Sequence, residues 1–179
     1  MRYVKIPLER IGVLIGHNGE IKDDLMKMTG LDININSEDG EVEICERDDK
    51  DPLVMLKTEN VVRAIGRGFS PKKAFLLLDD EMDFYIFDLH DYGGKKLSHL
   101  RRLKSRMIGK NGKTKHVIEE LTNSKISIYG HTISIISNTL KIDSLKRAID
   151  MLLSGSKHAS VYKFLEKQMK ELKKQQLGF

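Results

Sequence analysis

The stretch Ile108-Gly109-Lys110-Asn111-Gly112 decides how this sequence is interpreted, because it repeats the earlier stretch Ile15-Gly16-His17-Asn18-Gly19. The two stretches lie 93 residues apart and differ at one position only. With 14 glycines in 179 residues, a Gly-x-x-Gly motif is expected by chance about once in a chain of this length, so a single copy would carry little weight. Two copies in a matched context indicate an internal duplication.

Apolar residues recur at the same offset beyond the glycines, which extends the repeat over a whole folding unit. The matched pairs are Leu14 and Met107, Leu25 and Ile118, Met28 and Leu121, Ile33 and Ile126, and Ile35 and Ile128. Length alone allows one or two domains, so the repeat is the argument for two. We expect the first domain at residues 1–78, including a linker helix, and the second at residues 79–179, including a C-terminal helix.

Both halves show the same predicted order of elements: strand, helix, Gly-x-x-Gly turn, helix, strand, strand, helix. In the first half, the elements are expected at residues 2–7, 8–15, 20–28, 32–36 and 41–45, then in a helix capped by Asp51. The helix at 20–28 is expected to bury Ile21, Leu25 and Met28, and a short linker helix is expected to begin at Ser70 and Pro71.

In the second half, a strand is expected at residues 83–89, and a connector at 91–96 precedes the first helix. A hairpin pairs residues 125–129 with 132–136, a closing helix follows, and a C-terminal helix runs from about residue 161 to residue 176.

This order of elements resembles the eukaryotic-type (type I) KH domain. The resemblance implies an α+β fold of two tandem KH domains, each a three-stranded sheet with three helices, plus a C-terminal helix. In KH domains, the Gly-x-x-Gly turn clamps the backbone of about four nucleotides. Glycines let the backbone approach the phosphates, and the following helix directs free N–H groups and its positive end at them. The predicted function is therefore binding of single-stranded RNA.

Charge differs sharply between the two units. Residues 95–115 contain nine basic side chains and no acidic ones: Lys95, Lys96, Arg101, Arg102, Lys104, Arg106, Lys110, Lys113 and Lys115. The equivalent residues 2–22 contain four basic and two acidic side chains, and residues 20–51 contain twelve acidic and four basic ones. We therefore expect the second unit to dominate phosphate binding, while the acidic first unit repels RNA or attracts a basic protein surface.

The predicted RNA-binding residues follow from the turns and the basic helix. In the second unit they are Gly109, Lys110, Asn111, Gly112, Lys113, Arg101, Arg102, Lys104, Arg106 and Ile108, and in the first unit Gly16, His17, Asn18 and Gly19.

Composition limits which partners, cross-links and cofactors the protein is expected to have. The net charge of +5 mildly favours a polyanionic partner, and Cys45, as the single cysteine, excludes an intrachain disulfide. The sequence contains no apolar run long enough for a signal peptide or membrane span, and its six histidines lack metal-ligand spacing. We expect a cytoplasmic protein without a cofactor, metal, membrane or small-molecule substrate. It is not expected to be an enzyme, because no nucleophile and base occur at motif spacing.

Three longer motifs extend the resemblance from KH domains in general to one family of KH proteins. They are residues 64–71 with 74–80, residues 100–114, and residues 151–155 with His158 and residues 161–166. Together they resemble the archaeal members of the family known in eukaryotes as the partner of the Nob endonuclease. The resemblance implies a small-subunit ribosome assembly factor whose partners are rRNA near its 3′ end and the maturing endonuclease. Eukaryotic relatives have lost the first Gly-x-x-Gly, whereas Gly16 and Gly19 are present here.

Two alternatives stay open on sequence grounds. A general KH-type mRNA-binding regulator would share the turn but would not need the motifs around Gly66 and Tyr162. A protein scaffold would use the acidic first half to dock a partner.

Overall fold

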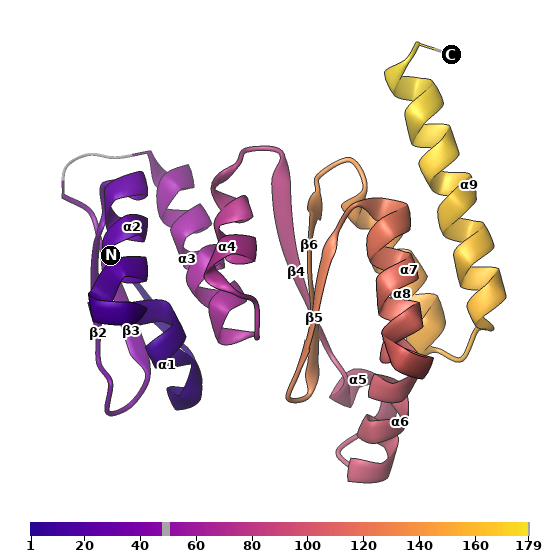
Figure 1. Ribbon diagram of the computed structural model, residues 1–179, viewed down its shortest axis with the longest axis horizontal. Coiled ribbons are helices and arrows are strands. Elements are labelled where there is room, and N and C mark those ends of the chain that lie inside the picture. The colour runs from indigo at the N-terminus through magenta and orange to yellow at the C-terminus, as the bar shows by residue number, and fades with distance from the viewer. Residues whose placement is uncertain (48–50, 179) are drawn as a thin grey trace. The chain divides into compact units, whose positions relative to one another are not determined.

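The computed structural model describes residues 1–47 and 51–178. The chain divides into two compact units, Met1–Phe84 and Tyr85–Phe179. Each unit contains one three-stranded sheet with helices packed on one of its faces, as Figure 1 shows. The α+β fold with two repeated units and a C-terminal helix is confirmed.

The first unit follows the predicted order of elements. Its elements are β1 (Arg2–Lys5), α1 (Leu8–Ile15), η1 (His17–Gly19), α2 (Glu20–Thr29), β2 (Asp32–Ile35), β3 (Glu41–Cys45), α3 (Pro52–Gly66), α4 (Pro71–Ala74) and η2 (Phe75–Leu78). The sheet order is β1-β3-β2, and β3 pairs antiparallel with both neighbours. Asp51 caps α3 as predicted, because its carboxylate accepts a 2.9 Å hydrogen bond from the Leu53 backbone N–H.

The second unit repeats this plan with two additions. Its elements are β4 (Met82–Asp88), α5 (His90–Gly93), α6 (Leu97–Ile108), η3 (Lys110–Gly112), α7 (Lys113–Thr122), β5 (Lys125–Tyr129), β6 (Thr132–Asn138), α8 (Ile142–Leu153) and α9 (His158–Gln176). The sheet order is β4-β6-β5, equivalent to that of the first unit. The short helix α5 lies where a connector was expected, and α9 begins three residues earlier than predicted.

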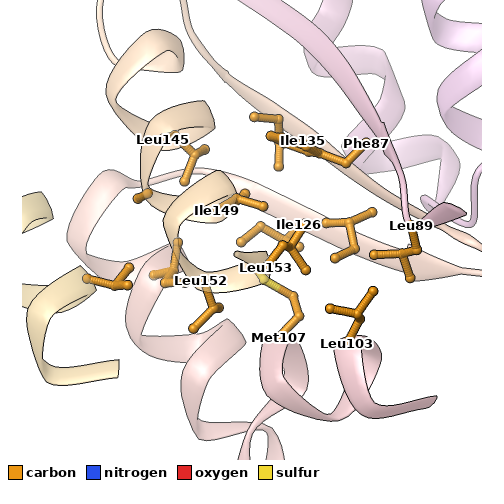
Figure 2. Close-up of a cluster of buried hydrophobic side chains, with 14 of the residues drawn as sticks. Phe87, Leu89, Leu103, Met107, Ile126, Ile135, Leu145, Ile149, Leu152 and Leu153 are labelled. Atoms are coloured by element: carbon orange, nitrogen blue, oxygen red, sulfur yellow. The ribbon is translucent and has the colours of Figure 1, made fainter. Parts of the chain in front are cut away.

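The core of the second unit lies between its sheet and helices. Figure 2 shows Phe87, Leu103, Met107 and Ile149 among the apolar side chains that converge there from strands and helices. Met107 is fully buried, as is its counterpart Leu14 in the first unit. This pair carried the repeat in the sequence because its two members occupy the same core position in each unit.

One predicted core contact is wrong. Met28 is 64% exposed, and the buried face of α2 consists instead of Leu25 and Thr29. Burial of Thr29 is possible because its hydroxyl donates a 2.7 Å hydrogen bond to the Leu25 carbonyl. Thr122 makes the same 2.7 Å bond to the Ile118 carbonyl in the second unit.

The linker after α3 packs within the first unit. Phe69, Ala74 and Leu77 are buried, and Lys57 Nζ donates a 3.3 Å hydrogen bond to the Leu78 carbonyl. Pro71 begins α4 as predicted, while the Ser70 side chain makes no capping hydrogen bond. Across residues 1–47 and 51–178, none of the helices combines the length and the apolar character needed to cross a lipid bilayer.

Candidate nucleic-acid interface

The two glycines of each turn are required for different reasons. Gly109 has φ 73°, and a Cβ atom there would lie 2.1 Å from Thr114 Oγ1, so the position accepts no side chain. Gly112 has φ 74°, but a Cβ atom there would meet nothing within 4 Å. The first glycine therefore lets the turn pack on α7, whereas the second leaves open space beside the start of that helix.

The first turn has the same backbone geometry. Gly16 and Gly19 have φ values of 75° and 82°, and a Cβ atom at Gly16 would lie 2.4 Å from Ile21 Cγ1. Asn18 and Asn111, at φ 51° and 55°, occupy the left-handed region that asparagine tolerates better than most residues. The middle residues of both turns are exposed, so their side chains face solvent.

The helix that follows each turn begins with opposite charge. Helix α2 has Glu20 and Asp23 in its first turn, which its positive N-terminal end stabilises. Helix α7 begins with Lys113 and has no acidic residue in its first turn. A cation at this end costs roughly 0.3–1 kcal/mol. Lys113 is therefore poorly suited to stabilise the helix but well placed to meet an anionic ligand.

Some cations of the basic stretch 95–115 also have structural contacts. Arg106 Nε and Nη2 donate to the carbonyls of Leu152 and Ser156 at 3.0 and 2.6 Å, which joins α6 to the end of α8. Lys115 Nζ lies 3.0 Å from Glu119 Oε1 on the same helix. Among the predicted RNA-binding cations, Arg101, Arg102, Lys110 and Lys113 are exposed, whereas Lys104 is half-buried.

Two of the four basic residues at positions 2–22, Arg2 and Arg10, make similar structural contacts in the first unit. Arg10 donates to the carbonyls of Ile65 and Phe69, both at 2.8 Å, and burial lowers its pKa from the ordinary value. Arg2 pairs with Glu59 of α3 at 2.5 Å. The charge available to RNA around the first turn is therefore smaller than the sequence count alone indicated.

A pocket of about 530 Å³ lies beside the second turn. It brings together five predicted residues with four that sequence reasoning missed, and its lining consists of Arg102, Ser105, Arg106, Gly109, Lys110, Lys113, Thr114, His158 and Tyr162. The predicted residues Arg101, Lys104, Ile108, Asn111 and Gly112 do not line it. Ile108 is 39% exposed next to the turn.

Helix α9 contributes two aromatic rings to this pocket. Tyr162 Oη donates a 3.3 Å hydrogen bond to Thr114 Oγ1, and His158 Nε2 lies 3.0 Å from the Arg106 carbonyl oxygen. The two rings meet edge to face, with centroids 6.3 Å apart. Both residues belong to a motif that carried the family resemblance, and that motif was the signal that could have assigned them to the site.

Comparisons with known proteins agree with this geometry. Residues 83–170 match a model of the eukaryotic-type KH domain (KH-domain type I) for the second KH unit of PNO1, and residues 1–67 match the KH domain. The chain is 32% identical to the RNA-binding protein pno1 of Dictyostelium discoideum, over 90% of this chain and 69% of that protein. This chain belongs to the PNO1 family. A KH domain-containing protein of Methanocaldococcus jannaschii is 43% identical, over 96% of this chain and 75% of the relative.

Solved archaeal structures share the fold of this PNO1-family chain. Dim2p from Pyrococcus horikoshii is 44% identical with a TM-score of 0.86, covering 93% of this chain and 98% of that one. A second structure, the a/eIF2alpha–aDim2p–rRNA complex from the same organism, has 43% identity and a TM-score of 0.87, covering 95% of this chain and 94% of that one. A protein of unknown function from Aeropyrum pernix has 36% identity and a TM-score of 0.94, covering 98% of this chain and 93% of that one.

The first unit of this PNO1-family member presents an acidic sheet face. Strand alternation buries Val42 and Ile44 and places Glu41 and Glu43 on the opposite face. Hydrogen bonds from Asn34 and then Tyr3, at 3.1 and 3.0 Å, lower the pKa of Glu43 and favour its ionised form. A hollow of about 730 Å³ lies over this face. Such a surface repels RNA phosphates.

Proposed function

We propose that this protein binds single-stranded RNA of the small ribosomal subunit during its assembly, near the 3′ end of the rRNA, with the second KH unit as the main site. The observation that carries the proposal is the pocket in which the turn glycine Gly109, the cations Lys110 and Lys113 and the rings of His158 and Tyr162 meet. Family membership supports the rRNA target, since a related archaeal protein has been solved with rRNA.

The second turn and its pocket together combine the two features that binding of single-stranded RNA requires. Cations and the helix N-terminus attract the phosphates, and open space beside Gly112 lets the backbone of the nucleic acid approach the turn. The aromatic rings on α9 provide a surface for stacking a base, an interaction worth roughly 1–3 kcal/mol per base. A phosphate bound beside Lys113 would offset the repulsion between this cation and the positive N-terminal end of α7.

The direct test compares two RNAs of equal length at one stated salt concentration. One carries the 3′ end of small-subunit rRNA and the other an unrelated single strand. We expect at least tenfold tighter binding of the rRNA segment. Equal affinities would contradict the assignment and favour a general mRNA-binding regulator.

We also propose that the acidic sheet face of the first unit docks a basic protein surface, and that the rRNA-maturing endonuclease is this partner. Glu41 and Glu43, with the exposed ring of Tyr3, give the face charge and an aromatic anchor. Replacing Glu41 and Glu43 with Lys should abolish capture of the purified endonuclease while RNA affinity does not fall. Undiminished capture by this variant would place the partner surface elsewhere.

A further inference from the structure

A cluster of potential metal ligands lies in the second unit, and none of its members lines the RNA pocket. Asp88 ends β4, His90 begins α5 and His131 lies in the turn between β5 and β6. Asp88 Oδ1 is 3.2 Å from His90 Nδ1 and 3.0 Å from His131 Nδ1. One ligand atom from each residue lies within 4.8 Å of the other two.

The backbone positions this cluster from both sides. The His90 backbone N–H donates a 2.9 Å hydrogen bond to Asp88 Oδ1, which fixes the carboxylate above the start of α5. The Leu89 backbone N–H donates a 2.8 Å hydrogen bond to the His131 carbonyl, which holds the β5–β6 turn against the end of β4. The donor atoms are therefore brought together by main-chain geometry as well as by contact between side chains.

The donor set suits a transition metal ion. Zn²⁺ takes imidazole nitrogen and carboxylate oxygen at about 2.0–2.2 Å, so tetrahedral ligand atoms lie about 3.3 Å apart. The separations of 3.0 and 3.2 Å from Asp88 Oδ1 are close to that value. The imidazole planes are 16° from parallel with centroids 4.4 Å apart, so one ring must rotate for both nitrogens to face one ion. Side-chain exposures of 32% for His90 and 46% for His131 leave room for that rotation.

We propose that Asp88, His90 and His131 bind one Zn²⁺ ion, with water as the fourth ligand. Each neutral imidazole binds the ion through an unprotonated Nδ1 and keeps its ring proton on Nε2, so bonds to the ion replace the direct contacts between the two Nδ1 atoms and the carboxylate. Its bonds tie the end of β4 and the start of α5 to the β5–β6 turn. The competing account is a hydrogen-bonded cluster of two histidines and a carboxylate with no affinity for metal.

The test is calorimetric titration of the chelator-treated, full-length protein with Zn²⁺ at neutral pH. We expect one ion per chain, and binding at least tenfold weaker for His131→Gln. His116→Gln is the matched control, because His116 Nε2 also faces a carboxylate, Glu120 Oε1 at 3.1 Å, but within residues 1–47 and 51–178 this pair belongs to no group of three potential ligands. This control should bind Zn²⁺ as the unaltered protein does.

Two further measurements test the same three ligands. Co²⁺ in place of Zn²⁺ should give the visible absorption of a tetrahedral ion in the unaltered protein and in His116→Gln, and should lose it in His131→Gln. Zn²⁺ should raise the melting temperature of the unaltered protein and not that of His131→Gln. If His131→Gln does not fold, His90→Gln and Asp88→Asn make the same comparison. Absence of binding, or binding that survives all three ligand substitutions, would overturn the proposal.

Discussion

Replacing Lys110 and Asn111 together with Asp tests the division of labour between the two turns. Both side chains are exposed, and the change keeps Gly109 and Gly112, so the fold should be retained. Asp tolerates the left-handed conformation of Asn111, at φ 55°, nearly as well as Asn does. The matched control replaces His17 and Asn18, which are equally exposed and have the same backbone geometry.

The expected loss follows from the charge that each variant changes. The second-turn variant loses one lysine and gains two carboxylates, a change of three units of charge. One unit of charge at 4 Å in water is worth about 1 kcal/mol, so the loss is about 3 kcal/mol, or roughly 150-fold in affinity. The first-turn variant gains two carboxylates and loses no lysine, a change of two units of charge, so the same rule gives a loss of about 2 kcal/mol, or roughly 30-fold. The loss should therefore be about fivefold smaller in the first turn, where Arg2 and Arg10 are already engaged in structural contacts.

Fluorescence anisotropy with a labelled single-stranded RNA at several salt concentrations measures both effects. The slope of log affinity against log salt should fall by about 0.7 when the Lys110 phosphate contact is lost, and by less for the first-turn variant. Circular dichroism checks that both variants are folded. If two folded variants lose equal affinity, charge does not rank the two turns and the reasoning is refuted.

Three further predictions concern the residues that support the site. Gly109→Ala should lower the free energy of unfolding by about 3 kcal/mol, because the alanine Cβ would overlap Thr114 and the residue would have to keep a positive φ. Gly112→Ala should cost only about 1 kcal/mol, because its positive φ is strained but its Cβ meets open space. Equal costs of the two substitutions in urea titrations would contradict this reasoning. Tyr162→Ala should weaken RNA binding about tenfold through loss of stacking, while Tyr162→Phe stays within about twofold, and an equal loss in both would assign the effect to the hydroxyl. Arg10→Met should lower stability by about 2 kcal/mol and leave RNA affinity unchanged, and a loss of affinity in the folded variant would argue for a direct RNA contact.

The fold could be predicted well from the sequence because both units need the same close packing between the Gly-x-x-Gly turn and the helix after it, and this need produces the repeat. Gly16 and Gly109 each touch the following helix so closely that no side chain fits, and the flanking core positions follow from that packing. Helix boundaries were predictable where local chemistry sets them, as at Asp51 with its capping hydrogen bond. Helix α5, with four residues, has no periodic pattern that could have revealed it.

The parts of the site that escaped prediction depend on tertiary contact. His158 and Tyr162 lie some 50 residues beyond the turn, and only the packing of α9 against α7 brings them to the pocket. Asp88 and His131 are 43 residues apart and meet through sheet pairing, so metal-ligand spacing along the chain could not indicate them. Met28 was assigned to the core wrongly because helical spacing alone does not reveal that the Thr29 hydroxyl donates to the Leu25 carbonyl, which allows Thr29 to be buried instead.

We propose that the second turn and its pocket hold the RNA. Photochemical crosslinking of the intact protein to a thiouridine-substituted RNA from the 3′ end of small-subunit rRNA, followed by mass spectrometry of the linked peptides, tests it most directly. We predict crosslinks concentrated between Arg101 and Lys113 and at Tyr162. Crosslinks concentrated on the acidic sheet face around Tyr3 and Asn34, or at His17 in the first turn, would contradict the account.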